Sequence, residues 1–237
     1  MSELSAFATT YWKSIIAFTW FLACFYGYLF YSEHKAQSTP CLSSVLHQYR
    51  QAWMERILER EMRVADTTVL ANLERSVAFF ASSTMLILAG LMTVLSSTDE
   101  IISLVADVPF ASTATRAEWE IKLLLLVALF MYAFFKFTWS LRQYGFCAVM
   151  LGGAPNPDDQ VSERERKATA LRMARVASLA ANNFNQGLRT YYFSLAVIGW
   201  FFNPWLFMAL SSGIVWVLYR REFQSRTLRE LVTSRAG

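Results

Sequence analysis

The sequence has little of what a metal site, a disulfide framework or a soluble enzyme needs. It contains three cysteines and two histidines, and the cysteines have no CxxC spacing. Neither a structural zinc site nor a disulfide framework is therefore predicted. The sequence also lacks a P-loop, a dinucleotide-binding glycine fingerprint, an HExxH motif and a GxSxG motif. We expect no cofactor, no bound metal and no catalytic residues, so the protein is not predicted to be an enzyme.

Charge is scarce as well. Only 17% of the residues are Asp, Glu, Lys or Arg, and 55% are apolar, whereas ordinary soluble domains carry about a quarter charged residues. The apolar residues gather in runs at 14–31, 77–97, 121–141 and 191–219. A helix of about 20 apolar residues crosses the ~30 Å hydrocarbon core of a bilayer. The sequence therefore predicts an all-α, polytopic integral membrane protein with a single membrane domain over 1–237.

The last apolar run is longer than one membrane span needs. It contains Asn203 followed by Pro204. Asn is a favoured N-cap and Pro is tolerated at the first position of a helix. We therefore divide the run into a helical hairpin with spans at 186–202 and 204–221, which makes five spans. The alternative is one long helix kinked at the proline, which makes four.

Charge also predicts the orientation in the membrane. Lys and Arg gather in 32–76, in 142–189 and in the tail after 219, whereas 98–120 carries one arginine among five acidic residues. Cationic loops stay in the cytoplasm. The N-terminus is therefore predicted to be periplasmic and the C-terminus cytoplasmic, and only the hairpin returns the cationic tail to the inside. Residues 1–5 have no cationic region and no cleavage site follows, so the first run is interpreted as a retained span.

The basic composition also indicates a class of partner. The chain has a net charge of +4 and a pI near 9.0, which could suggest nucleic acid. Its arginines lie beside membrane spans, however, so the anionic lipids of the cytoplasmic leaflet are the simpler partner and no nucleic acid is expected.

Two polar stretches between the apolar runs show helical periodicity. Apolar residues recur at helical spacing in 43–76 and 160–189, which predicts two long amphipathic cytoplasmic helices. No glycine or proline separates the first helix from the run at 77–97, so we expect it to continue unbroken into that span. In the second helix, Glu163 precedes Lys167 by four residues, which is the favoured order for a helical ion pair.

Short strings recur in the same order along the chain. FTW occurs at 18–20 and at 137–139, and RxxRVA occurs at 60–65 and at 172–177. These echoes favour a two-unit parallel repeat in which each unit is a span, a cytoplasmic helix and a span, related by an axis along the membrane normal. Chance recurrence in apolar sequence is the alternative.

Several polar residues beside the spans are candidates for a ligand, ion or headgroup site: Lys136, Arg142, Asn185 and Arg189. A charge inside a span is a functional-site hypothesis by default, although Lys136 lies near the span end and can snorkel to the headgroups. Asn185 can instead hydrogen-bond between helices. A second group, Glu61, Arg63 and Asp66, is predicted to form an ion-pair network, with ion, headgroup or substrate binding as the alternative.

Several long strings, taken together, resemble a known family. They are REMR at 60–63, SVAFFAS at 76–82, YAFFKFTWSLRQ at 132–143, FNQGLR at 184–189 and NPWL at 203–206. In this order they resemble the bacterial membrane-protein family called domain of unknown function 599. The resemblance extends from about residue 49 to 226. It implies an integral protein of the bacterial cell inner membrane and implies no activity.

Two functions from different classes fit these observations. The first is an oligomeric channel, transporter-like or anionic-lipid-binding protein, in which Lys136, Arg142 and Arg189 line a basic cytoplasmic vestibule. The second is an accessory subunit of a larger membrane complex that docks through its cytoplasmic helices, with Trp53, Ile57 and Met62 as the contact stripe. A membrane-bound enzyme is a third alternative. It would need Glu61 or Asp66 to meet the polar residues of 182–189.

Overall fold

The computed structural model describes residues 2–100, 102 and 115–233. Every long element in this part of the chain is a helix. The helices are α1 (Ser2–Ser38), α2 (Leu42–Ile57), α3 (Val64–Ser96), α5 (Arg116–Gly152), α6 (Glu163–Phe202), α7 (Pro204–Phe223) and α8 (Arg226–Thr233). The predicted all-α class is confirmed.

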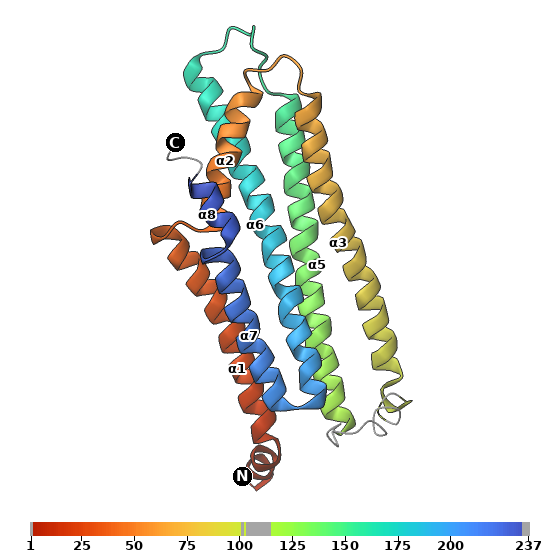
Figure 1. Cartoon of the computed structure of the whole chain (residues 1–237). Coiled ribbons are helices and arrows are strands. Elements are labelled where there is room, and N and C mark those ends of the chain that lie inside the picture. Colours follow the sequence, from red (N-terminus) through yellow and green to blue (C-terminus); the bar gives the residue numbers. More distant parts are fainter. Residues whose placement is uncertain (1, 101, 103–114, 234–237) are drawn as a thin grey trace.

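The long helices lie side by side along one common direction (Figure 1). The order across the bundle is α1, α7, α6, α5 and α3, because each of these helices packs against the next. At one end of the bundle lie the start of α1 and the turn from α6 to α7. At the other end lie the connection from α2 to α3 and the loop from α5 to α6, with α2 and α8 packed beside this half (Figure 1).

The contact between α5 and α6 is made close by small residues. α6 presents a row of buried alanines to the interior: Ala170, Ala174, Ala177, Ala180 and Ala181. The Ser140 hydroxyl of α5 donates a hydrogen bond to the Ala180 carbonyl at 2.7 Å. Further along α6, Gly187 lies directly against the ring of Phe137. Small residues and interhelical hydrogen bonds of this kind let two helix backbones approach each other in a membrane protein.

Two apolar clusters fill the bundle. One joins α2, α3, α5 and α6 around the fully buried Phe137 and Met173. The other joins α1, α5, α6 and α7 around Phe21 and Phe207, whose rings stack with centroids 5.1 Å apart. Trp200 also stacks on Phe207, with ring centroids 4.9 Å apart. This second cluster lies in the half of the bundle that contains the apolar runs.

In the part of the chain that the structure describes, three helices are long and apolar enough to cross a membrane: Trp12–Ser32 within α1, α3 and α5. Large apolar side chains on their surfaces are exposed, including Leu86 at 76% and Phe79 at 67%. Exposed apolar faces of this extent are typical of helices that contact lipid. The predicted spans 14–31, 77–97 and 121–141 correspond to these three helices, so a membrane protein is supported. The spans at 186–202 and 204–221 stay predictions.

The predicted helix break at the asparagine–proline pair is confirmed. α6 ends at Phe202 and α7 begins at Pro204. Between them, Asn203 has extended backbone angles, and its side-chain oxygen accepts a hydrogen bond from the Trp205 N–H at 2.8 Å. α7 then returns alongside α6 (Figure 1). Local capping chemistry therefore produces the hairpin, and the single kinked helix is not formed.

The predicted continuous helix over 43–76 is wrong. α2 ends at Ile57 and α3 begins only at Val64, and the chain reverses direction between them (Figure 1). The indole N–H of Trp53 donates to the Asp66 carboxylate at 2.8 Å. In one unbroken helix these two residues would be ~20 Å apart along the axis.

This reversal is caused by tertiary contacts, because the connection from Ile57 to Val64 contains no glycine or proline. Ile57 and Leu58 are buried at the point where α2 ends. The guanidinium of Arg63 donates to the backbone carbonyls of Ala154 at 2.9 Å and Pro155 at 2.5 Å, in the loop after α5. Intrinsic helix propensity is a weak preference that such contacts override. The other predicted helix, 160–189, is the first half of α6 and continues without a break into 186–202.

The arrangement of the helices does not support the predicted two-unit repeat. The string at 60–65 lies in the α2–α3 connection and the first turn of α3, whereas its counterpart at 172–177 lies within α6. Matching strings with different local structure do not support duplication, and the two-unit repeat stays a prediction.

Gly187 tests the close packing of α5 on α6. A Cβ at this position would lie 2.5 Å from a ring carbon of Phe137, whose side chain is fully buried. We expect Gly187→Ala to destabilise the protein by about 1–3 kcal/mol, the usual cost of overpacking. Chemical unfolding in mixed detergent micelles measures this. The control is Gly145→Ala in α5, where a Cβ would meet nothing within 4 Å, so stability should stay equal or rise. Equal destabilisation by both variants would contradict the packing.

Candidate functional site

Arginines from three helices converge on one pocket. Arg50 of α2, Arg189 of α6 and Arg221 of α7 line a cavity of about 150 Å³, which is also bounded by Tyr28 of α1. Glu222 is the one acidic residue in its lining. Three guanidiniums against one carboxylate give this cavity, hereafter the arginine pocket, a formal charge of +2.

Arg189 is held in place from several sides. One of its terminal nitrogens donates to the Ser32 hydroxyl at 3.3 Å, and the other lies 3.5 Å from a carboxylate oxygen of Glu222. The guanidinium also lies over the ring of Tyr28, 5.4 Å from its centroid. With both charged side chains only about 16–17% exposed, the pair is screened less than a surface pair would be. The predicted candidates Arg189 and Asn185 both line this pocket.

The other two arginines form no ion pair with any residue in the described part of the chain. Arg50 donates to the Ser178 hydroxyl at 3.4 Å, and burial lowers the pKa of its guanidinium. The group nevertheless stays charged at neutral pH, because arginine does not deprotonate in proteins. Arg221 donates to the Tyr192 hydroxyl at 2.8 Å. Both cations therefore have hydroxyl partners and lack a protein anion.

The remaining groups of the pocket supply more donors than acceptors. One oxygen of Glu222 accepts the backbone N–H of Ser43 at 3.2 Å, in the first turn of α2, and the other faces Arg189. The Tyr28 hydroxyl is buried without a hydrogen-bond partner among the described residues. Buried polar groups are rarely left unpaired. A bound oxyanion would pair the Tyr28 hydroxyl and the two arginines together.

A further cation lies at the same end of α1 and α7. The ammonium of Lys35 donates to the hydroxyls of Tyr31 at 2.8 Å and Tyr219 at 3.0 Å. The hydrogen bonds to Tyr219 and Tyr31 raise the pKa of Lys35. This lysine therefore adds positive charge beside the arginine pocket.

Lys136 and Arg142 lie elsewhere. They line a separate hollow of about 470 Å³ at a different face of α6, together with Asn183. The Lys136 ammonium lies 3.4 Å from the Asn183 side-chain oxygen, and Arg142 is exposed over the ring of Phe146. Asn183 and Arg189 are six residues apart in α6, which places them about 120° apart around a helix and so on different faces. The single vestibule predicted for Lys136, Arg142 and Arg189 is therefore not formed.

The predicted network of Glu61, Arg63 and Asp66 has different partners in the structure. The Asp66 carboxylate is buried and pairs with Arg60 at 2.7 Å, while the same oxygen accepts from Trp53. Arg63 contacts backbone carbonyls as described above, and Glu61 is exposed without an ion pair in the part that the structure describes. The mixed charges fix the chain reversal between α2 and α3.

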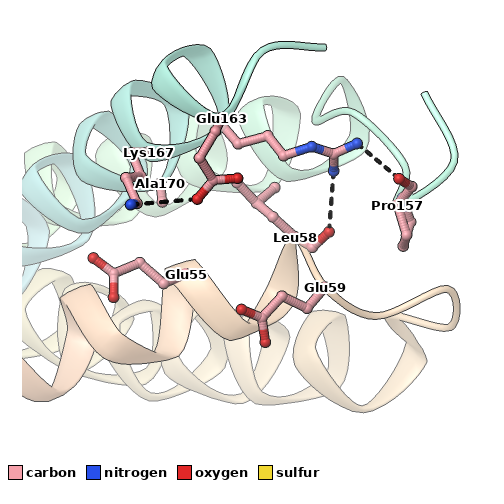
Figure 2. Close-up of a pocket in the computed structure, with 8 residues that line it drawn as sticks. Glu55, Leu58, Glu59, Pro157, Glu163, Lys167 and Ala170 are labelled. Carbon is pink, nitrogen blue, oxygen red and sulfur yellow. Dashed lines mark hydrogen bonds and ion pairs between the residues drawn. The ribbon is translucent and has the colours of Figure 1, made fainter. Parts of the chain in front are cut away.

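Figure 2 shows a further polar pocket, at the end of the bundle where α2 meets the start of α6. Arg166 donates to the carbonyls of Pro157 at 2.8 Å and Leu58 at 3.5 Å, joining the two loops. The predicted pair of Glu163 and Lys167 is present at 3.4 Å. Glu55 and Glu59 are exposed, and no group of three metal-ligating side chains that could hold an ion occurs among the described residues. We interpret this pocket as a structural junction.

Comparison with known proteins places the chain in a family. The family model described as "Protein of unknown function, DUF599" matches residues 16–227. The chain belongs to this family. No curated protein matches the chain, and no solved structure does. All residues of the arginine pocket lie within the matched segment.

Sequence reasoning missed Arg50, Arg221, Glu222 and Tyr28 as parts of this site. Arg221 and Glu222 stand at the end of an apolar run, where a conspicuous charge could have marked them. Arg50 carried no such signal, because its place depends on α2 folding back beside α6.

The buried Asp66 provides a test of the chain reversal. We expect Asp66→Asn to destabilise the protein by about 1–3 kcal/mol, because it removes the ion pair with Arg60 and weakens the acceptor of a buried indole N–H. Unfolding in mixed micelles measures the difference. Glu61→Gln removes a neighbouring charge that has no such contacts, so its stability should stay within about 0.5 kcal/mol of the parent. A larger effect at Glu61 than at Asp66 would contradict these contacts and would support the network predicted from the sequence.

Proposed function

We propose that this protein is a multi-span protein of the bacterial inner membrane that binds the phosphate group of an anionic lipid in the arginine pocket. The observation that carries the proposal is the surplus of guanidiniums: Arg50 and Arg221 lack a protein anion, and Arg189 shares the one carboxylate. Guanidinium groups bind phosphate oxygens through paired, charge-assisted hydrogen bonds.

The surroundings of the pocket favour a lipid over a free solute. Tyr28 also lines a larger hollow of about 550 Å³ between α1 and α7, whose other walls include Trp20, Trp216 and Tyr219. This hollow is walled mainly by apolar and aromatic side chains, which suit an acyl chain. Aromatic side chains of this kind are typical of the membrane interface. A headgroup phosphate among the arginines and a chain along the α1–α7 hollow would occupy both.

The proposed orientation matches this ligand. The arginine pocket lies near the C-terminal ends of α1 and α7, and each of these ends leads into a cationic segment. The positive-inside rule assigns such segments to the cytoplasm. The cytoplasmic leaflet is the one rich in anionic lipids, which attract juxtamembrane Lys and Arg.

Binding is favoured over conduction by a single copy of the chain. The aromatic cluster around Phe21, Phe193 and Phe207 fills the bundle between the arginine pocket and the opposite end, and all three side chains are fully or almost fully buried. A conduction path would need polar groups or water there. This favours the lipid-binding form of the first predicted function over its channel form.

The accessory-subunit alternative loses its predicted contact stripe. Ile57 is fully buried and Trp53 donates to Asp66, so both serve the interior of this chain, and only Met62 is exposed, at 78%. Among the described residues, the groups that the enzyme alternative needs have separate partners: Asp66 contacts Arg60 and Trp53, whereas Arg189 contacts Ser32, Tyr28 and Glu222. The two clusters share no residue.

Lipid binding can be measured by native mass spectrometry of the purified full chain with added phosphatidylglycerol. We expect Arg189→Gln and Arg50→Gln each to weaken binding by tenfold or more. The reason is that each variant loses at least one hydrogen bond to a charged group, which contributes about 1.5–3 kcal/mol. Arg142→Gln is the matched control, because this arginine is exposed outside the pocket. Equal affinity for phosphatidylcholine, which is neutral overall, or equal weakening by Arg142→Gln, would refute the proposal.

Inorganic phosphate separates the two sources of the same chemistry. If the ligand is a lipid, millimolar phosphate should displace phosphatidylglycerol poorly, because it leaves the α1–α7 hollow unfilled. Glu222→Gln should bind the lipid more tightly than the parent, since it raises the formal charge of the pocket from +2 to +3 while keeping a side-chain oxygen for Ser43. Efficient displacement by phosphate would assign the pocket to a free anion.

A further inference from the structure

We infer a second ligand site at the opposite end of the bundle, where a cavity around Lys122 is built to take the carboxylate of a short apolar molecule. The cavity has a volume of about 220 Å³. α1 contributes Ser14 and Phe18 to its walls, α5 contributes Glu118, Ile121 and Lys122, and the end of α6 contributes Trp200.

Lys122 is a buried cation without an anion. The residue is only 4% exposed. Its ammonium makes no hydrogen bond or ion pair with any described residue. The ammonium lies 5.6 Å from the ring centroid of Trp200 and 5.8 Å from that of Phe201. Such cation–π contacts offset part of the desolvation of the charge, but a buried ammonium normally also has an ion-pair or hydrogen-bond partner.

An acidic residue of the same helix also lines the cavity, but its carboxylate is engaged in the helix cap. Glu118, one turn before Lys122, forms the capping box at the start of α5, where its carboxylate accepts the backbone N–H of Thr115 at 2.9 Å. It forms no ion pair with Lys122 in the described structure. Among the described residues, none forms an ion pair that would complete this site, and a bound carboxylate would do so.

Trp200 adds a second unpaired donor. Its indole N–H is buried and has no hydrogen-bond acceptor among the described residues. The ring itself is fixed, because it stacks on Phe18 at 5.9 Å and on Phe207 at 4.9 Å. Two unpaired donor side chains in a wall that is mainly apolar select a ligand with an acceptor at one end and hydrocarbon at the other.

The size of the cavity limits the ligand. A volume of about 220 Å³ is below the ~300–1,000 Å³ of pockets that enclose drug-sized molecules. A short alkanoate therefore fits better than a complete phospholipid. The site shares no lining residue with the arginine pocket, so it is independent of the proposed headgroup site.

Three probes of equal length test the chemistry without any variant. Octanoate, octanol and octylammonium are titrated by calorimetry into the purified full chain in a non-ionic detergent, with empty micelles as the blank. We expect saturable binding of octanoate, at least tenfold weaker binding of octanol, and no binding of octylammonium. Absence of saturable octanoate binding, or equal binding of octanoate and octanol, overturns the inference.

Matched variants then locate the site. Lys122→Met keeps the length of the side chain and removes the charge, and it should reduce octanoate affinity at least tenfold while leaving the melting temperature equal or higher. Lys136→Met makes the same change in the same helix outside the cavity, and Arg189→Gln disables the arginine pocket. Both should bind octanoate as the parent does. Loss of octanoate binding in Arg189→Gln with retention in Lys122→Met would place the carboxylate in the arginine pocket and overturn the second site.

Discussion

The close packing of α5 against α6 is the contact on which the rest of the structure depends. Gly187 admits the Phe137 ring, and the buried alanines of α6 allow α5 to approach along the first half of that helix. α6 is thereby fixed along its length between two neighbours, with α5 on one side and α7 on the other. Its polar residues then face different surroundings: Asn183 faces the hollow beside Lys136, Arg189 faces α1 and α7, and Trp200 closes the far end.

The distribution of charge follows from the solvent that surrounds the bundle. Aromatic side chains fill the middle of the half that contains the apolar runs. Cations that form no ion pair with a described residue lie toward its two ends. An unpaired buried charge is costly, so it persists where a ligand or a lipid headgroup can complete it. Arg50, which is half-buried at one end, and Lys122, which is buried at the other, are in this position, whereas Arg221 is exposed. The two proposed ligands share this cause and differ in their chemistry: one is a phosphate among several guanidiniums, and the other is a carboxylate at a single ammonium.

Features set by local chemistry could be predicted from the sequence. The three apolar helices follow from composition alone, and the break at Asn203 follows from a capping side chain and a proline at adjacent positions. Arg189 and Asn185 stood out because polar residues beside an apolar run are unusual. The reversal after Ile57 could not be predicted, since it is produced by partners distant in sequence, such as the carbonyls of Ala154 and Pro155 that accept from Arg63. Arg50 was missed for the same reason.

The orientation of the bundle decides whether the arginine pocket meets the anionic cytoplasmic leaflet. It can be measured with single cysteines in a variant whose native Cys24, Cys41 and Cys147 are replaced by serine. Ala117 lies at the Lys122 end and Lys167 at the opposite tip, and both are exposed. We expect a membrane-impermeant maleimide to label Ala117→Cys in intact cells and Lys167→Cys only after lysis. Labelling of Lys167→Cys in intact cells, with Ala117→Cys protected, would contradict the proposed orientation and with it the lipid assigned to the arginine pocket.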